Sequence, residues 1–353
     1  MFPGKRWRSV LGLGLTLWFA GCGGGGGGDN SPPPPPNPLY VRVSGRDTNS
    51  GGDPANALQT ISKAAQIARG GYTIIVGPGT YLEGVTLTSQ GKAPDVVTFL
   101  ADITGAMTKD PAGAVIINAA GTRAGAAFSL AGTSGTTIDG FTTTGGADAG
   151  ILVKSGSNNF MIQNCVVFNN PGDGIQVQDS SNVLIFNNLV YGSGGIGIRV
   201  AGQSSGSPDT HIINNTVFGQ GSLGVSIGNT TRPSPRAFLR NNIIQNNGGD
   251  ASIKVFTNPR SDEGYDGDFN LLLPFLYLPS TGIKGDNDFA GDALFVAPGV
   301  GNFHLRTNSP AIDHGGALNL PSSKTNILRG RTTTGSGVDS SNTPFDLGYH
   351  YPR

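Results

Sequence analysis

Apolar and polar positions alternate over short segments that return at a regular interval through the middle of the chain. Five such segments, each reading Gly-Ile-x-Val or a close variant, span residues 150–153, 174–177, 197–200, 224–227 and 252–255. Their second residues lie 24, 23, 27 and 28 positions apart. Period-2 alternation over short runs is typical of half-buried strands, and self-similarity at this spacing is typical of a solenoid. We therefore predict an all-β fold in which each repeat forms one coil and equivalent strands pair in parallel.

A second apolar segment follows each of the first four and ends in asparagine. The four terminal residues are Asn164, Asn187, Asn214 and Asn241. Asparagine tolerates the left-handed backbone conformation that a sharp corner requires, and its amide can bond to the equivalent residue of the next coil. We predict that these residues turn the corners and form an internal ladder, and that they do not bind sugar.

The first coil requires a cap, because an open sheet end would pair with other chains. Leu58, Ile61, Ala65 and Ala68 fall on one face of a short amphipathic helix predicted for residues 57–69. A strand at residues 72–76 follows directly. We expect this helix to close the N-terminal end of the solenoid.

The N-terminus has the pattern of an export signal. Basic residues precede an apolar run at residues 10–20, which is too short to cross a bilayer as a mature helix. The run ends in Phe19-Ala20-Gly21-Cys22, which resembles a bacterial lipoprotein signal in which the cysteine receives the lipid. The resemblance implies a signal peptide at residues 1–21 and an anchor at Cys22 in the cell envelope, at the outer membrane or cell surface. The alternative is ordinary secretion with an incidental cysteine.

A glycine tract and a proline tract follow Cys22, and residues 22–38 are interpreted as a flexible and then stiff tether. Three of the 23 basic residues precede Cys22 but none of the 23 acidic ones does, so the mature chain would have more acidic than basic residues. This balance argues against nucleic acid as a partner. Cys165 would be the remaining cysteine, so no intramolecular disulfide is expected, and its apolar surroundings predict a buried side chain. We expect a monomer.

Motifs at both ends of the predicted solenoid resemble a known superfamily. Residues 40–47, 58–65 and 77–81 look like the N-terminal signature of pectate-lyase-like right-handed parallel β-helix proteins. Ser309-Pro310-Ala311-Ile312-Asp313 and residues 346–349 look like the C-terminal region of exported bacterial β-helix proteins. The resemblance implies one right-handed, single-stranded parallel β-helix over residues 39–353, with an N-terminal cap at about 39–71 and an irregular C-terminal capping region at about 270–353. These motifs belong to the fold and carry no chemistry.

Candidate chemistry lies at the outward positions of the Gly-Ile-x-Val strands. The column reads Leu152, Gln176, Arg199, Ser226 and Lys254. Arg199 and Lys254 are two coils apart, which corresponds to about 10 Å along the face and is close to the length of a disaccharide. Lys154 belongs to the next outward column, and turns beside the same strands carry Asp148 and Asp173.

These residue types fit β-elimination on a uronate. The reaction needs a base for the C5 proton and a cation that neutralises the carboxylate, and a desolvated Lys or Arg can act as the base. In lyases resembling this chain, a calcium ion held by aspartates supplies the cation. We therefore select Arg199, Lys254 and Lys154 as candidate catalytic residues, and Asp173 and Asp148 as candidate calcium ligands. The alternative is that all five are solvated surface charges or turn residues.

Three functions remain open at this point. The first is a lyase acting on an acidic polysaccharide, and the second is a non-catalytic glycan-binding protein. The third is an adhesive or structural surface protein in which the solenoid is a spacer. Both tryptophans, Trp7 and Trp18, lie in the predicted signal peptide, which favours uronates over neutral glycans that are held by aromatic stacking.

Overall fold

The strands of the chain wind into three parallel sheets that share one apolar core. The computed structural model describes residues 37–88, 96–202, 207, 209–229, 237–256, 265–278, 284–318, 320–339 and 344–352. The predicted signal peptide, Cys22 and all but the last two residues of the tether lie outside these residues. None of the described helices is long and apolar enough to cross a membrane.

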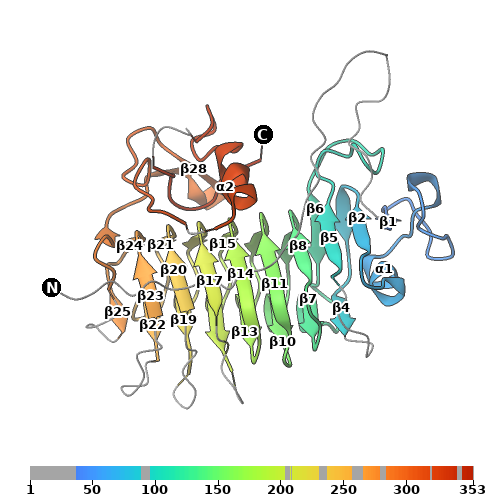
Figure 1. Ribbon diagram of the computed structural model, residues 1–353, viewed down its shortest axis with the longest axis horizontal. Coiled ribbons are helices and arrows are strands. Elements are labelled where there is room, and N and C mark those ends of the chain that lie inside the picture. Colours follow the sequence, from blue (N-terminus) through green and yellow to red (C-terminus); the bar gives the residue numbers. More distant parts are fainter. Residues whose placement is uncertain are drawn as a thin grey trace. The chain divides into compact units, whose positions relative to one another are not determined.

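Successive strands along the chain enter sheets C, A and B in turn, so each coil contributes one strand to each sheet (Figure 1). Sheet A contains β1 (Pro38–Val41), β2 (Thr73–Val76), β5 (Thr98–Ala101), β8 (Thr137–Asp139), β11 (Asn158–Gln163), β14 (Ser181–Phe186), β17 (Thr210–Ile213), β20 (Ala237–Arg240) and β23 (Tyr265–Asp268). Sheet B contains β3 (Gly79–Tyr81), β6 (Val115–Asn118), β9 (Thr142–Thr144), β12 (Val166–Phe168), β15 (Leu189–Tyr191), β18 (Thr216–Phe218), β21 (Ile243–Gln245), β24 (Leu271–Leu273) and β26 (Phe289–Ala290). Sheet C contains β4 (Val85–Thr88), β7 (Ala126–Ala131), β10 (Ala149–Lys154), β13 (Asp173–Gln178), β16 (Ile198–Ala201), β19 (Val225–Ile227), β22 (Ile253–Val255) and β25 (Tyr277–Leu278).

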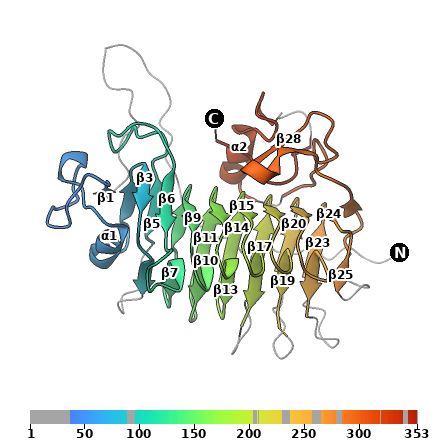
Figure 2. The same ribbon diagram turned by 180° about the vertical axis from the view of Figure 1, so that it is seen from behind.

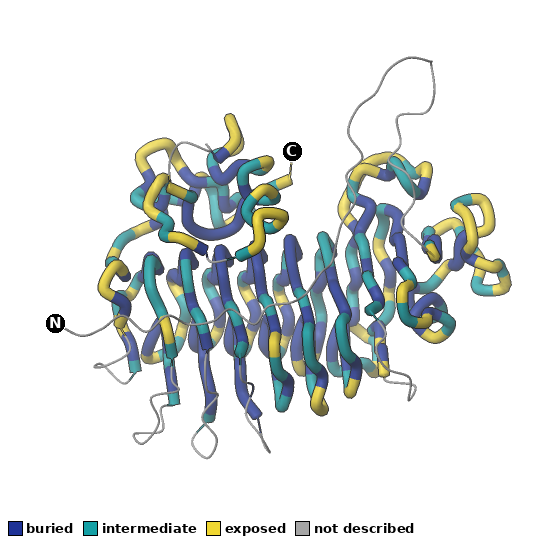
Figure 3. Tube along the Cα trace, in the orientation of Figure 1, coloured by how far each residue is buried: buried dark blue, intermediate teal, exposed yellow. Residues whose placement is uncertain are grey.

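The sequence repeat sets the register of these sheets. Ile151 lies beside Ile175, Ile175 beside Ile198, Ile198 beside Val225 and Val225 beside Ile253. All five side chains are fully buried, and so are the apolar residues two positions further along β10, β13 and β16. Figure 3 shows buried residues along most strands, with exposed residues gathered in turns and in the segments outside the sheets. Equivalent apolar residues therefore stack from coil to coil, as the repeat predicts.

The predicted N-terminal cap is present. Helix α1 (Ile61–Ile67) is shorter than predicted and lies at the β1 end of the solenoid (Figure 1). Leu58, Ile61, Ala65 and Ala68 are all buried in the main core. The Thr60 side chain accepts a hydrogen bond from the backbone nitrogen of Lys63 and so caps the helix. A single 3₁₀ turn, η1 (Pro54–Asn56), precedes it.

In the central coils, the corner between sheets A and B is turned by an asparagine with a positive φ. Asn164, Asn187, Asn214 and Asn241 have φ values of 58°, 54°, 53° and 58°, which confirms the predicted left-handed corners. One link of the predicted ladder is present, since Nδ2 of Asn187 donates to Oδ1 of Asn164 at 2.9 Å, but the continuous ladder lies one residue later than predicted. Its members are Asn188, Asn215, Asn242 and Asn270.

The side-chain oxygen and nitrogen of each ladder asparagine both form hydrogen bonds. The backbone and amide nitrogens of Asn188 both donate to Oδ1 of Asn215, at 2.9 and 3.0 Å. Asn215 repeats both contacts with Asn242. Cys165 occupies the same position one coil earlier, and its backbone nitrogen donates to Oδ1 of Asn188. As predicted, Cys165 is fully buried, and burial raises its pKa to about 12.

The C-terminal region packs along the side of the solenoid. It contains the antiparallel strands β27 (Phe295–Ala297) and β28 (Asn302–Leu305), the 3₁₀ turn η2 (Pro298–Val300) and helix α2 (Ser322–Arg329). Figures 1 and 2 show β28 and α2 alongside the coils from opposite directions. Phe295, Phe303 and Leu305 pack in one cluster with Leu189 and Ile243 of sheet B. A smaller cluster joins Leu328 of α2 to Phe186 and Ile213 of sheet A. The region therefore covers the outer side of sheet B and part of sheet A and leaves the outer side of sheet C uncovered by these clusters.

Candidate functional site

The predicted outward column is present on sheet C. Leu152, Gln176, Arg199, Ser226 and Lys254 lie side by side in successive strands. Arg199 keeps 38% of its side chain exposed, whereas Ile198 and Val200 on either side of it are fully buried. Two strands separate Arg199 from Lys254, which gives about 10 Å along the solenoid axis at the usual strand spacing. The sheet thus holds two cations in a fixed register on one face.

Arg199 and Asp173, predicted for separate roles, form one ion pair. Nε of Arg199 donates to Oδ2 of Asp173 at 2.6 Å, and Nη2 donates to Oδ1 at 3.0 Å. The backbone nitrogen of Ile196 also donates to Oδ1, at 2.8 Å, and only 6% of the Asp173 side chain is exposed. A guanidinium held by two bonds to a carboxylate keeps its proton and its direction. The geometry therefore favours binding of an anion by Arg199 over proton abstraction.

The two lysines differ from Arg199 in their surroundings. Lys254 lies in β22, and its Nζ is 5.4 Å from the centre of the Phe256 ring, a cation–π distance. Lys154 ends β10 and is half-buried. Neither lysine forms an ion pair with another described residue. Their ammonium groups therefore remain candidates for contact with a ligand, and their catalytic roles stay predictions.

The predicted calcium ligands lie on neighbouring coils, where the backbone nitrogen of Asp173 donates to the carbonyl of Asp148 at 2.9 Å, and their role as ligands stays a prediction. Asp148 is exposed in the turn before β10, while both oxygens of Asp173 are engaged by Arg199 and Ile196. Across the described ranges, no three His, Cys, Asp or Glu side chains gather in a group that could hold a metal. Calcium prefers six to eight oxygen ligands. The described residues do not supply this donor set, so no step proposed below depends on calcium.

A hollow that sequence reasoning missed opens beside sheet C, where three successive turns lead from sheet B into β7, β10 and β13. Its volume is about 450 Å³. Its lining consists of small or uncharged residues, among them Asn118, Thr122, Thr144 and Asn169. The only available sequence signal was the recurrence of Gly, Ala, Thr and Asn in these turns, which is also what ordinary turns contain.

A second outer column, on sheet A, contains a stacked aromatic pair. The rings of His211 and Phe238 lie 4.4 Å apart at 21°, on neighbouring strands. Burial lowers the pKa of His211 and so favours the neutral imidazole. Arg240 in the same strand as Phe238 pairs with Asp266 at 2.9 Å. Stacking along the column explains His211 as a packing residue.

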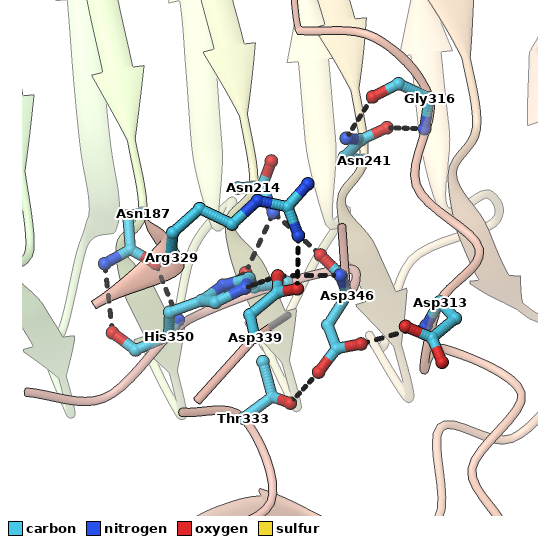
Figure 4. Close-up of polar contacts among 11 residues, drawn as sticks. Asn187, Asn214, Asn241, Asp313, Gly316, Arg329, Thr333, Asp339, Asp346 and His350 are labelled. Atoms are coloured by element: carbon cyan, nitrogen blue, oxygen red, sulfur yellow. Dashed lines mark hydrogen bonds and ion pairs between the residues drawn. The ribbon is translucent and has the colours of Figure 1, made fainter. Parts of the chain in front are cut away.

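The corner asparagines have a role that the sequence did not reveal, because they bind the C-terminal segment (Figure 4). His350 donates its backbone nitrogen to Oδ1 of Asn187, and Nδ2 of Asn187 donates to the carbonyl of His350 at 3.0 Å. Nδ2 of Asn214 donates to the carbonyl of Asp346 at 3.0 Å. Asn241 forms a reciprocal pair with Gly316, at 3.1 and 3.0 Å. Three successive coils therefore hold the returning chain.

A buried polar network completes this attachment (Figure 4). Asp339 accepts from Nε2 of His350 at 2.9 Å and from Nη1 of Arg329 at 2.8 Å. The His350 and Asp339 side chains are 0% and 1% exposed, so no substrate can reach them. Asp346 accepts from the backbone nitrogen of Asp313 and from the Thr333 hydroxyl, and its burial raises its pKa. The network is structural, and His350 is a packing residue within it.

Three solved structures illustrate what the chain is similar to. A pectate lyase, Pel9A, is 16% identical over 91% of this chain and 97% of its own, with a TM-score of 0.48. A rhamnogalacturonan lyase is 16% identical over 71% of this chain and 80% of its own, with a TM-score of 0.39. An alginate lyase from Paenibacillus sp. strain FPU-7 is 16% identical over 71% of this chain and 94% of its own, with a TM-score of 0.39.

Sequence comparisons bear on the fold. The search of curated proteins gives no match. The family described as "Right handed beta helix region" matches residues 104–261. This match covers the central coils, and together with the three parallel sheets it confirms the predicted right-handed parallel β-helix.

Proposed function

We propose that the chain binds an acidic polysaccharide that lies along the outer face of sheet C, parallel to the solenoid axis. The observation that carries the proposal is the fixed direction of Arg199, which Asp173 holds with two hydrogen bonds while more than a third of the arginine side chain stays exposed. A preorganised guanidinium loses little freedom when it binds a carboxylate.

The position of Lys254, the second cation of the column, indicates which class of polysaccharide would fit. Lys254 lies two strands from Arg199 in the same column, about 10 Å away along the axis. Ser226 lies between the two in the register and is buried, so Arg199 and Lys254 are the groups of these three strands that a polymer could reach. A polymer with carboxylates at a disaccharide interval matches this spacing, and an uncharged polymer would offer no anion to either cation.

β-Elimination is the second function to test, because Lys254 forms no ion pair with another described residue and lies beside the proposed carboxylate path. In that reaction the lysine amine would take the C5 proton of a uronate. The electron pair of the C–H bond would form the C4–C5 double bond. The C4–O bond to the leaving sugar would break with its electron pair on that oxygen, which would take a proton from water. The amine must be unprotonated at the start of this step.

One experiment separates binding from catalysis. The full-length protein would be titrated with polygalacturonate, alginate and glucuronan in a calorimeter, and the same mixtures would be followed by ultraviolet absorbance for the unsaturated uronate product. Calcium and a chelator form parallel arms. We expect heat of binding with at least one uronate polymer and none with neutral dextran. Absence of binding to all three acidic polymers would overturn the proposal.

The absorbance decides between the two functions. Rising absorbance would establish a lyase, and its loss with chelator would support the calcium prediction. Binding with flat absorbance would identify a non-catalytic glycan-binding protein.

We also propose that the protein is exported and anchored by lipid at Cys22 in the cell envelope. The support is the basic, apolar and small-residue order of residues 5–22 and the tether that follows. Such an anchor would hold the β-helix close to a surface that carries glycans. The mass of the mature N-terminal peptide, compared between the native chain and Cys22→Ser, tests this. An unmodified Cys22 in the mature protein would exclude the anchor.

A further inference from the structure

The hollow beside sheet C lies at the same edge of the sheet as Asp173, beside the column that the proposed polysaccharide path follows. Its walls are the turns after β6, β9 and β12, which lead into β7, β10 and β13. Its middle turn precedes β10, which is two strands from the β16 strand that carries Arg199. The hollow is therefore offset from Arg199 by about 10 Å along the axis, the same step that separates Arg199 from Lys254.

The lining of the hollow contains hydrogen-bonding groups but no charge. Oδ1 of Asn118 accepts from the backbone nitrogen of Ala120 at 2.9 Å, and the Thr122 hydroxyl donates to the carbonyl of Ala119 at 2.7 Å. Among the described residues, the amide nitrogens of Asn118 and Asn169 donate to no other group. Both donors are thus available to a ligand with hydroxyl or carbonyl oxygens.

The charges nearest the hollow do not favour an anion. Arg123 and Asp148 are both exposed, and each follows a lining residue directly in the chain, so the turns around the hollow carry one charge of each sign. A carboxylate placed in the hollow would lose water without gaining a cation among the lining residues. A volume of about 450 Å³ is within the range of small-ligand sites, and alanine and glycine in the lining leave room for a ring.

From these observations we infer that the hollow is an uncharged subsite of the same binding face, which accepts a sugar unit whose carboxyl group is esterified or absent. The inference rests on the proposed function, because it requires a polysaccharide on sheet C. The ligand would then be a polymer with two kinds of sugar unit. Units with carboxylates would lie at Arg199 and Lys254, and an uncharged unit would lie in the hollow, one disaccharide step away. The polysaccharide would then be selected by its pattern of charge.

Filling the hollow tests the inference. Ala120 and Ala147 are exposed and line the hollow, so Ala120→Leu and Ala147→Leu fill it from two turns without disturbing the core. Ala112→Leu adds the same side chain at an exposed position outside the lining and serves as the matched control. Binding would be measured by calorimetry with polygalacturonate and with partially methyl-esterified polygalacturonate, after circular dichroism has shown that each variant is folded.

We expect both filled variants to bind the esterified polymer about tenfold more weakly than the native protein, and polygalacturonate within about twofold of it. The Ala112→Leu variant should bind both polymers like the native protein. If filling the hollow weakened binding of the two polymers equally, or changed binding of neither, the proposal of a subsite would be overturned. A native protein that binds polygalacturonate but not the esterified polymer would also overturn it. A native protein that binds neither polymer would instead contradict the proposed function itself.

Discussion

Replacement of Arg199 by alanine is expected to weaken binding of polygalacturonate by about tenfold or more. A charge-assisted hydrogen bond contributes about 1.5–3 kcal/mol, and about 1.4 kcal/mol corresponds to a factor of ten in affinity. The substitution also leaves Asp173, which is nearly buried, without its cation, and adds a negative charge to the face that the polymer must approach. Calorimetric titration of the full-length variant measures the effect.

Companion variants separate the role of charge from that of orientation. Lys254→Ala should weaken binding less than Arg199→Ala, because Lys254 lies over Phe256 and has no carboxylate that fixes its direction. Asp173→Asn keeps the shape of the side chain and removes the charge that holds Arg199. If orientation matters, this variant loses affinity although the face becomes more positive. A gain in affinity would show that net charge alone governs binding.

A matched control comes from the far end of the solenoid. Lys63→Ala removes one positive charge from α1, several strands away from β16, in a helix where alanine is well tolerated. It should bind polygalacturonate like the native protein. If it loses as much affinity as Arg199→Ala, the polymer responds to overall charge and sheet C is not a specific site.

Replacement of Asn215 by alanine is expected to lower the free energy of unfolding by about 4 kcal/mol, because buried groups left without partners cost about 1–3 kcal/mol each. Asn215 is fully buried. Its loss removes the acceptor of the backbone and amide nitrogens of Asn188, and the donor to the carbonyls of Ile185 and Ile213. Urea denaturation measures the change.

The control for Asn215→Ala is a substitution of an asparagine that is exposed to solvent instead of buried. Asn182 is exposed, and its φ of 53° is a conformation that glycine adopts without strain. Asn182→Gly should therefore change the free energy of unfolding by less than about 1 kcal/mol. Destabilisation of similar size in both variants would contradict the special role of the ladder.

Cys165 supplies an independent readout of the same experiment. Its thiol is fully buried with a raised pKa, so in a Cys22→Ser background a thiol reagent should react only with opened molecules. The backbone nitrogen of Cys165 donates to Asn188, the residue that Asn215→Ala deprives of its acceptor. We expect a faster thiol reaction in this variant and an unchanged rate in Asn182→Gly.

The fold of the central coils could be predicted because their pattern of apolar and polar residues recurs from coil to coil. One Gly-Ile-x-Val segment is ambiguous, but five in succession fix which residues stack, and the register of Arg199 beside Ser226 follows directly. The ladder was placed one residue early. At three corners two asparagines follow one another and look alike in sequence, and the left-handed turn at Asn214 determines that Asn215 points inward.

The contacts of the candidate site could not be predicted in the same way. Asp173 and Arg199 are 26 residues apart, and their pairing depends on the turn that aims Asp173 at the next coil. The Ser-Pro-Ala-Ile-Asp and Asp-Leu-Gly-Tyr motifs were recognised, but not that the backbone of Asp313 bonds to the side chain of Asp346. The C-terminal region lacks a repeat, so nothing in its sequence indicates that it returns along the side of the solenoid.

The attachment of the C-terminal segment to three coils has a mechanical consequence. His350 is fastened at β14, Asp346 at β17 and Gly316 at β20, so the last residues of the chain bind coils well before the final one. A pull on the C-terminus would therefore be delivered first to the middle of the molecule, and it would load the asparagine contacts together, in shear. Single coils could separate from the solenoid only after these asparagine contacts had broken. A protein built this way would resist traction applied through its C-terminus.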